Sequence, residues 1–554
     1  MRSRALCCSL LLVGVAGLML APGAFARTTT RYASAHTGTL VRVHAHRRAL
    51  AAADAVPLAS PIRGARRIPH TVSRLAAPSA APLAGAQALA TAPPSLLANF
   101  NGVSSRDSAV TNFGAEFEPP DQGLCAGNGF VVEMVNSAYT VYKPDGTVVT
   151  GPFNVNGPFD EGLTEFTSDP RCQYDAATNT WFATILFISS DNASSRLDIA
   201  VNTSGDPTKA WTTYQINTTD TGGKAGPKHP GCPCFGDQPL LGIDASNVYV
   251  STNEFSILGP QSNGAQIYAI AKSDLEQPGP PSSVLARFVH FDKLNIGGAP
   301  ATSVQPAITS GNPKAEFFLN SLDPTGTFDQ RIGVWAMTNR GAVATGGTPT
   351  LSSTVVNSEA YGVPPGAVQK GSTSLLDAGD DRMQQTQFLG GDLWGALDTS
   401  VTIPNDATAR AGAAWFDVRP TVSGSGANGV ITGAPIHRQG YVGVAGNYVL
   451  YPAIQAAPSG RVAMVMTLSG QRHFPSAAYS VLAKGATAFG DVTVAADGKT
   501  NYDPAATRWG DYSWAILDPS GNSVWMATEY IPPKASQTPD GLRNWGTRVL
   551  NLSL

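Results

Sequence analysis

The stretches FGDQPLLGIDASNVYVSTNEF (residues 235–255) and WGDYSWAILDPSGNSVWMATEY (residues 509–530) have nearly the same order of residue types. Each begins with an aromatic residue, Gly and Asp, so that Asp237 matches Asp511. A short apolar segment, a turn rich in Asp, Asn and Ser, and a second apolar segment ending near a Glu follow in both. Agreement of residue types at fixed offsets indicates a repeated structural unit.

Weaker copies of this pattern occur elsewhere in the chain. They begin near Asp121, Asp169, Ser303, Asp380 and Asn447. Together with the two stretches above, these make seven copies. Each copy has a polar or acidic start, a short strand, a Gly/Asn/Asp/Ser turn and a β-branched or aromatic strand, which is the signature of a β-hairpin.

The spacing of the copies leaves room for four short strands in each unit. No segment has convincing helical periodicity, and Gly and Pro interrupt most of the chain. Four-stranded units repeated radially form a β-propeller. We therefore expect an all-β, seven-bladed β-propeller over residues 95–554, with six or eight blades as alternatives. After Tyr530 only one good strand remains, so the stretch SLLANFNGVS, residues 95–104, is expected to close the last blade.

The N-terminus has the features of an export signal. Arg2 and Arg4 precede an apolar run, and Ala24-Phe25-Ala26 is a small-residue cleavage site. The sequence thus predicts a signal peptide over residues 1–26. No second apolar run long enough to span a membrane follows, so we expect a secreted, extracellular protein.

The segment 27–94 has a different composition from the rest of the chain. It holds nine Arg, no Lys and a single acidic residue, Asp54. Rich in Ala and Pro as well, it is predicted to be a disordered propeptide or a linker that spans a cell wall. The chain beyond it has 26 basic against 39 acidic residues, which argues against nucleic acid as a partner.

Four cysteines remain after signal cleavage: Cys125, Cys172, Cys232 and Cys234. An even number in an oxidising compartment favours two disulfides, and four cysteines allow three pairings. We favour Cys125–Cys172, which links the first strands of adjacent repeats and leaves Cys232–Cys234. A soft-metal site formed by His229 with Cys232 and Cys234 is the alternative.

The repeated acids are expected to meet at one end of the propeller. The first strand of a blade lies nearest the axis and the second returns antiparallel to it, so the start of one and the end of the other share a face. The residues predicted to surround this mouth are Asp121, Asp169, Asp237, Asp381, Asp511, Glu254 and Glu529, with Arg171, Arg382 and Arg508 close to them. The acids could instead cap turns. Rings of oxygen atoms can also hold Ca²⁺, which is a further alternative.

The same mouth also supplies candidates for catalysis. Arginine side chains bind carboxylates through two parallel hydrogen bonds, which would suit an acidic sugar. Tyr512 lies next to Asp511, and Glu529 could act as the base of Tyr512 if the two side chains meet. Glycoside hydrolysis requires two carboxyl groups at a defined separation. The candidate catalytic residues are therefore Tyr512, Glu529 and Asp511.

One segment resembles a known structural motif. In NTSGDPTKAW, Ser204, Asp206 and Trp211 match the Asp-box of sialidases and related propellers, with Thr208 in place of the usual Gly. The blade sequences also look like those of exported bacterial β-propellers of unassigned function, over roughly residues 95–554. This resemblance implies the fold and export, and it brings no catalytic residues.

Two functional hypotheses follow from the sequence. The first is an exported, non-catalytic, monomeric binding module, either free in the extracellular medium or associated with the cell surface, whose mouth holds a glycan, a peptide or protein ligand, or a cation. The second is a sialidase-like glycoside hydrolase that uses the residues of the same mouth. The sequence predicts no nucleic-acid partner and no membrane span for either.

Overall fold

The computed structural model describes residues 29–32, 35–43, 81, 83–88, 95–115, 117–277, 285–322, 328–502, 508–537 and 543–554. These residues are mostly β-strand, and the α-helices among them are α1 (Ser105–Thr111) and α2 (Lys272–Leu275). The predicted signal peptide lies outside the described residues.

The strands form successive antiparallel runs along the chain. The early strands are β5 (Gly123–Gly127), β6 (Phe130–Val135), β7 (Ala138–Tyr142), β8 (Val148–Phe153), β9 (Phe166–Asp175), β10 (Thr180–Ile188), β11 (Ser195–Asn202), β12 (Thr212–Asn217), β13 (Cys234–Ile243), β14 (Asn247–Ser256), β15 (Ser262–Ala271) and β16 (Leu285–Phe291). Within this part, β5 to β8, β9 to β12 and β13 to β16 each pair in sequence order.

The later strands continue the pattern. They are β19 (Gln305–Thr309), β20 (Glu316–Ser321), β21 (Asp329–Thr338), β22 (Thr350–Tyr361), β23 (Met383–Leu389), β24 (Asp392–Ile403), β25 (Asp406–Val418), β28 (Ile436–Val444), β29 (Asn447–Ala456), β30 (Val462–Gly470), β31 (His473–Leu482), β32 (Thr493–Ala496), β33 (Trp514–Leu517), β34 (Ser523–Tyr530) and β35 (Gly546–Ser553). Two short ribbons, β17 (Asn295–Ile296) with β18 (Ala299–Pro300) and β26 (Thr421–Ser423) with β27 (Val430–Gly433), project from the runs.

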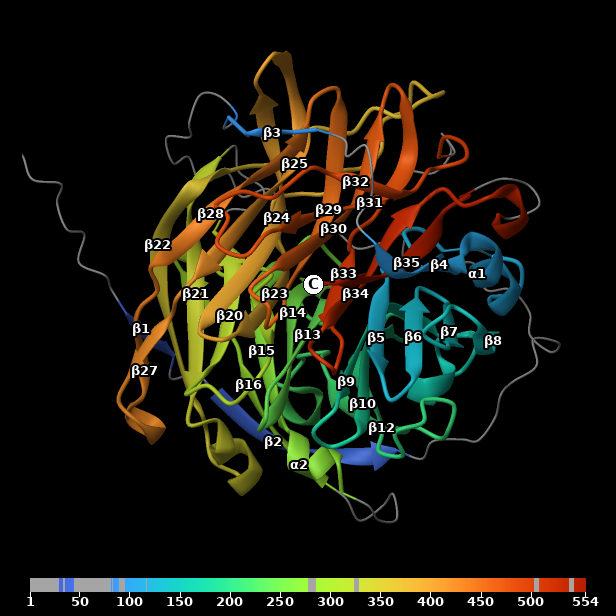
Figure 1. The fold of residues 1–554 in the computed structure, drawn as a ribbon. Helices are drawn as coiled ribbons and strands as arrows, with labels where there is room; N and C mark the ends of the chain where they lie inside the picture. The colour runs from blue at the N-terminus through green and yellow to red at the C-terminus, as the bar shows by residue number, and fades with distance from the viewer. Residues whose placement is uncertain are drawn as a thin grey trace, which may run out of the picture.

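Figure 1 shows that these runs follow one another around a common centre. The colour passes from cyan at β5 through green at β13 and yellow at β21 to orange at β24 and red at β34, which lies near β5 again. Neighbouring inner strands also touch, since β19 makes parallel bridges with β13 and β23. The chain is therefore an all-β protein with the radial arrangement of a β-propeller.

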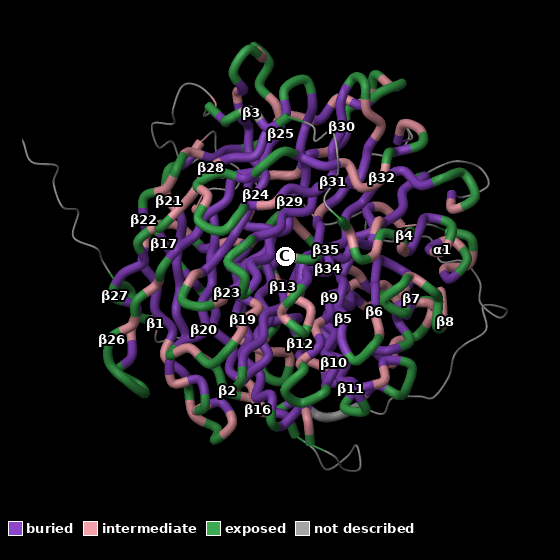
Figure 2. The backbone as a smooth tube through the Cα atoms, in the orientation of Figure 1, coloured by how far each residue is buried: buried purple, intermediate pink, exposed green. Residues whose placement is uncertain are grey.

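The inner strands are buried on both faces. Every residue of β13 and of β14 is buried, and Figure 2 shows burial along the strands with exposure concentrated in the loops. Adjacent sheets pack through large side chains; Trp181, Trp514 and Trp525 lie in one apolar cluster with residues of β5 and β6. Packing on two faces explains why a strand such as β10, with the sequence TWFATILFI, is almost continuously apolar.

An N-terminal strand completes the last run. Strand β4 (Leu96–Ser104) pairs antiparallel with β35, from Gly546 opposite Ser104 to Leu552 opposite Leu96. Helix α1 follows β4 directly, and its capping box is formed by Ser104 and Asp107. The predicted closure by residues 95–104 is confirmed.

Part of the segment 27–94 is ordered against the body, contrary to the expectation of disorder there. Strand β2 (Ala35–Val43) pairs antiparallel with β16 and β12. Strand β1 (Thr30–Tyr32) pairs with β22, and β3 (Ala86–Gln87) pairs parallel with β28. These sheet edges have unpaired backbone groups, which an additional strand satisfies regardless of its composition.

A repeated hydrogen bond joins each of several runs to the next. Side-chain oxygens of Asn136, Asn253 and Asp398, in or near second strands, accept from a backbone N–H in or just before the first strand of the following run. The distances are 2.9 Å to Asp169, 2.7 Å to Ser303 and 2.7 Å to Tyr451. Those three residues have positive φ, as do Asp121 and Asp511 at the start of other runs. The repeated polar positions therefore serve the architecture.

The structure contains both disulfides that the sequence analysis favours. Cys125–Cys172 joins β5 to β9 across 47 residues, and Cys232–Cys234 spans only 2. In the loop-entropy model the first stabilises the fold by about 4 kcal/mol and the second by about 1.5 kcal/mol. The first disulfide thus ties adjacent runs together, and the second contributes much less to stability.

The link between runs predicts the effect of Asn136→Ala. Asn136 donates to Asp121 Oδ2 at 2.7 Å and to the Pro119 carbonyl at 2.9 Å, besides accepting from Asp169. Removing the amide leaves buried groups without partners, so urea denaturation should show a loss of about 3 kcal/mol. The exposed Asn428→Ala is the control; an equal effect of both changes would contradict the role of the link.

Burial of Glu133 predicts a pH dependence of stability. Its Oε2 accepts from the Val103 N–H at 2.7 Å, joining β6 to the closing strand β4, and burial raises the pKa of Glu133 from 4.5 to about 7. The folded state therefore keeps a proton that the unfolded state releases, so stability is lost as the pH rises from 4.5 to about 7.

Glu133→Gln should remove this dependence, because an amide resembles the protonated acid. The variant should be more stable than the wild type at pH 8, by up to about 3 kcal/mol. Urea denaturation between pH 4 and pH 8 measures the slope, with the exposed Glu359→Gln as control. An unchanged slope in Glu133→Gln would show that Glu133 does not titrate in this range.

Candidate functional site

The acids at the starts of the inner strands converge at the centre of the ring. Asp121 and Asp169 have positive φ where their runs begin, and both are almost completely buried, as is Asp237. The charge of Asp511 acts on each of these three carboxyl groups. We call Asp121, Asp169, Asp237 and Asp511, together with Arg171, Arg382 and Arg508, the central cluster.

Arg171 lies in the interior of this cluster. It is fully buried, and its guanidinium lies 3.6 Å from the centre of the Tyr512 ring and 5.2 Å from that of Trp514. One amino group donates to the carbonyls of Pro170 and Asp121 at 2.8 and 3.2 Å. A buried cation over an aromatic face joins the second run to the last one.

The cluster reaches solvent through its other two arginines. Arg382 donates twice to Asp380, with Nε to Oδ1 at 2.7 Å and Nη2 to Oδ2 at 2.6 Å. Arg508 pairs with Asp511. All four residues are partly exposed, so they form a mouth above the buried part of the cluster. Asp380, which the sequence analysis does not select, is thus a member of this mouth.

Burial changes the acidity of the inner carboxyl groups. Burial raises the pKa of Asp121 well above its usual range, and the negative charges of Asp511 and Asp169 add to this effect. Burial also raises the pKa of Asp169 and of Asp237. Carboxyl groups with raised pKa values can hold a proton near neutral pH and donate hydrogen bonds.

Several polar atoms of the cluster have no hydrogen-bond partner within the described part of the chain. They are Asp237 Oδ2, the Tyr512 hydroxyl, and Nε and Nη2 of Arg171, whereas the side chains of Asp121 and Asp169 share a hydrogen bond. Buried polar groups are nearly always paired in folded proteins, so these atoms are positions at which water or a ligand can bind. The free atoms include both donors and acceptors.

The candidate catalytic residues are placed differently from the expectation. Tyr512 and Glu529 are buried, and Glu529 Oε2 accepts from the Gly510 N–H at 2.6 Å. No hydrogen bond between Tyr512 and Glu529 occurs among the described residues. Burial raises the pKa of each side chain well above its usual range. Asp511 is the one of the three that is partly exposed.

The two remaining predicted mouth residues are Asp381, which lies between Asp380 and Arg382 in the chain, and Glu254. Asp381 is fully buried, and its charge acts on the Tyr361 hydroxyl. Glu254 lies beside His229, with Oε2 at 2.9 Å from Nδ1. The pairing of first and second strands explains the position of Glu254. Val248 of β14 pairs with Ile243 of β13, and at the equivalent position of the last run Val524 of β34 pairs with Leu517 of β33.

This register makes Asn253, and not Glu254, the structural equivalent of Glu529. Each of them lies five residues after the corresponding valine. Successive side chains of a strand point to opposite faces, so a difference of one residue directs Glu254 away from the centre. The longer turn in the last copy causes this difference, which residue-type matching does not detect.

His229 is the centre of a second buried group, which we call the histidine cluster: Asp220, His229, Glu254 and Asp292. His229 Nε2 lies 2.9 Å from Asp292 Oδ2, and Nδ1 lies 3.6 Å from Asp220 Oδ2. Burial lowers the pKa of His229, but Asp220, Asp292 and Glu254 outweigh this and raise it to about 11. Burial raises the pKa of Asp220 to about 8.

Three groups of side chains have the spacing of metal ligands in the part of the chain that the structure describes. These groups are Cys232 with Cys234 and Glu254, Asp220 with His229 and Glu254, and Asp392 with Asp417 and His437. The acids of the central cluster do not form such a group. In the third group, Arg419 pairs with Asp392 and Arg438 with Asp417, so arginines already balance its acids.

Two other findings limit the location of a site. A cavity of about 200 Å³ lies among the turns between first and second strands and is lined by residues including Phe130, Asp518 and Trp525. It contains no residue of either cluster.

Neither α-helix among the described residues has the length and apolar character needed to cross a membrane.

The contact of Arg171 with Tyr512 predicts a difference between two substitutions. Arg171→Leu removes a buried positive charge that acts on Asp169 and a donor to the Pro170 and Asp121 carbonyls, and should lower the free energy of unfolding by about 3 kcal/mol or more. Tyr512→Phe removes a hydroxyl that has no partner, and should change it by about 1 kcal/mol or less. Thermal and urea denaturation measure both. Similar losses in both variants would show that the hydroxyl has a structural role.

Comparisons with known proteins give the following result. No protein-family model and no curated protein sequence matches the chain. Among solved structures, an α-L-arabinanase of Penicillium chrysogenum has a TM-score of 0.35 and 11% identity over 83% of this chain and 99% of its own. The endosialidase of phage phi92 has a TM-score of 0.37 and 8% identity over 82% and 69%.

An α-L-arabinofuranosidase of Fusarium graminearum is similar to the same extent, with a TM-score of 0.34 and 10% identity over 81% of this chain and 97% of its own. Similarities of this strength transfer neither a site nor an activity to the chain.

Proposed function

We propose that this protein is an exported β-propeller of seven blades that binds a hydroxyl-rich ligand, such as a glycan, at the mouth of the central cluster. Six blades would be the runs that begin with β5, β9, β13, β19, β23 and β29. The seventh would be β33 to β35 with β4. In this proposal residues 1–26 are the signal peptide, 27–94 a propeptide or linker, and 95–554 the monomeric binding unit.

The uncommitted polar atoms of the central cluster carry the proposal. Carboxylate oxygens accept hydrogen bonds from hydroxyl groups, guanidinium groups donate to them, and a phenol can do both. The cluster offers all three types in one place. The partly exposed Arg382, Arg508 and Asp511 are where a ligand would enter. Ligand sites usually combine such convergent polar groups with aromatic side chains, as Tyr512 provides here.

The two disulfides support the proposed extracellular location, because disulfides persist in oxidising compartments. The order of β1 and β2 against the body supports a role for part of the 27–94 segment after export. It would then cover sheet edges and leave the remainder as a tether to the cell surface.

Binding to a glycan panel tests the proposed function. The purified protein should retain a subset of the glycans, and Arg508→Ala or Arg382→Ala should weaken that binding about 10-fold or more, because a hydrogen bond to a charged group is worth about 1.5–3 kcal/mol. Arg419→Ala, which removes an exposed arginine paired with Asp392, is the control. Retention that is equal in all variants would place the ligand elsewhere.

A glycoside hydrolase is the second candidate. It is favoured by the proximity of Asp121, whose pKa burial raises, to the partly exposed Asp511. A protonated acid and an accessible carboxylate are the pair that glycosidases use. Sugars released from the panel would identify an enzyme, and Asp511→Asn should then abolish release. The exposed Asp145→Asn should leave it unchanged. Retention without release supports the binding module.

A further inference from the structure

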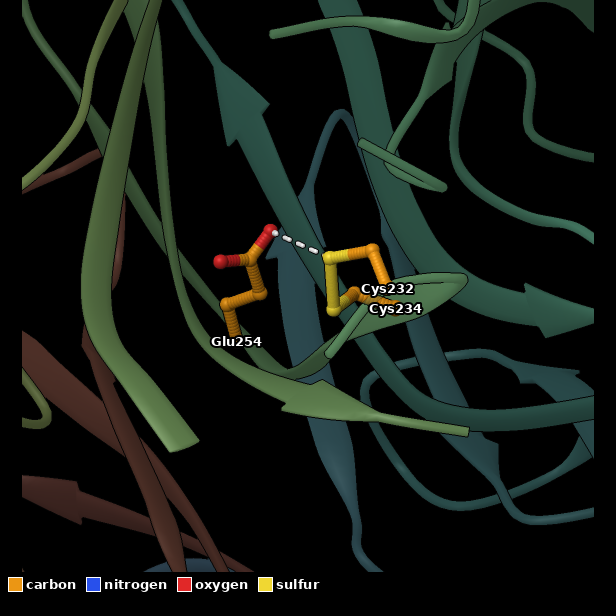
Figure 3. Close-up of side chains that lie close together, drawn as sticks. All are labelled: Cys232, Cys234 and Glu254. Carbon is orange, nitrogen blue, oxygen red and sulfur yellow. Dashed lines mark hydrogen bonds between the residues drawn. A yellow bond between two sulfur atoms is a disulfide. The ribbon is translucent and has the colours of Figure 1, made fainter. Parts of the chain in front are cut away.

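The Cys232–Cys234 disulfide lies at the edge of the histidine cluster, next to a buried carboxylate. Figure 3 shows Glu254 directed toward the two sulfur atoms, with Oε1 at 4.0 Å from Cys232 Sγ. Cys232 is partly exposed, while Cys234 is buried. The other disulfide differs in this respect, because Cys125 and Cys172 are both fully buried.

Glu254 is held firmly in this position. Both of its oxygen atoms lie within 3.0 Å of His229 Nδ1, and Gln266 donates to Oε2 at 3.3 Å. Asp292 fixes the opposite side of the His229 ring at 2.9 Å. His229 and Asp292 are thus positioning residues for the carboxylate that faces Cys232.

A hydrogen-bond donor lies on the other side of the disulfide. Asn263 Nδ2 is 3.7 Å from Cys234 Sγ and 3.9 Å from Cys232 Sγ. It is held in place by donating to the Pro230 carbonyl at 3.0 Å. An accessible sulfur with a proton acceptor beside it, and a second sulfur with a donor beside it, is an arrangement suited to thiol–disulfide exchange.

We propose that Cys232–Cys234 is a redox-active disulfide that oxidises a dithiol substrate, with Glu254 as the proton acceptor. This chemistry is independent of ligand binding at the central cluster, because none of its residues belongs to that cluster. The short loop supports the proposal, since a disulfide that spans two residues constrains the unfolded chain little.

The first step forms a mixed disulfide. One thiol of the substrate gives its proton to Glu254 Oε1 as its sulfur bonds to the accessible Cys232 Sγ. The bond between Cys232 and Cys234 breaks, and its electron pair goes to Cys234 Sγ, where the Asn263 amide stabilises the negative charge.

The second step releases the product. The second thiol of the substrate attacks the substrate sulfur that is bonded to Cys232 and gives its proton to the Cys234 thiolate. Cys232 leaves as a thiolate and recovers the first proton from Glu254. The dithiol is oxidised to a disulfide, and the Cys232–Cys234 pair is reduced to two thiols, with all protons and electrons accounted for.

Graded reduction of the native protein with dithiothreitol, followed by alkylation and peptide mapping, tests the proposal. Cys232 and Cys234 should become alkylated at least 10-fold faster than Cys125 and Cys172. Reduced glutathione, a monothiol, should form a mixed disulfide on Cys232. Reduction of both disulfides at the same rate, or only after unfolding, would overturn the proposal.

Variants of Glu254 separate its chemical role from a structural one. Glu254→Gln should slow exchange at least 10-fold at pH 7, and its rate should then rise about tenfold for each pH unit, because only the substrate thiolate reacts. The wild type should show a shallower profile. Glu254→Asp, which keeps a carboxylate, should restore part of the rate and the shallow profile.

The exposed Glu359→Gln is the matched control and should behave as the wild type. Continued protection of Cys125 and Cys172 in each variant establishes that the fold is intact. A rate and pH profile in Glu254→Gln equal to those of the wild type would exclude Glu254 as the proton acceptor and overturn the mechanism.

Discussion

The antiparallel pairing of β35 with β4 holds the rest of the structure in place. Without it, the last run would end in an open edge whose apolar face has no neighbour. Residues 96–104 supply the missing strand, and Val103 extends the contact into the first run through Glu133. A strand from the start of the chain thus fixes its end, so the ring depends on a contact between residues more than 400 positions apart in the sequence.

Closing the ring also creates the central cluster. Each run begins at the same end of its inner strand, so the polar side chains of these positions have to converge near the axis. The backbone N–H of Asp169 is satisfied by Asn136, while its carboxyl group is buried together with those of Asp121 and Asp237. Arg171, which packs against the Tyr512 ring, partly balances the negative charge of Asp169. The raised pKa values of the inner acids therefore follow from the architecture.

The sequence was sufficient to predict the all-β class, the repeat, the closing strand and the pairing of Cys125 with Cys172, because these depend on local patterns and on chain order. It also placed Asp121, Asp169, Asp237 and Asp511 together. The prediction from sequence was wrong where the register between two paired strands determines which face a side chain lies on. Matching Glu254 with Glu529 by residue type overlooked the longer turn of the last copy, and one residue of register sends a strand side chain to the other face.

Burial was the other property that the sequence did not reveal. Tyr512 and Glu529 look like accessible polar residues in the chain, yet the packing of adjacent sheets encloses both. The pairing of β2 was not predicted, because the composition of this segment is that of a linker. The edges of β16 and β12 offer backbone partners that do not depend on side chains.

The two polar clusters differ in a way that bears on function. In the central cluster, arginines from several runs face several acids, and the atoms without partners are both donors and acceptors, which suits recognition of a neutral or weakly charged hydroxyl-rich molecule. In the histidine cluster His229 lies beside three carboxyl groups, and His36 and Lys293 also approach Asp292. The carboxylate of Glu254 is held as a hydrogen-bond acceptor beside the neighbouring disulfide, where in our proposal a substrate thiol supplies the proton. In our two proposals, the central cluster serves ligand binding and the histidine cluster serves proton transfer.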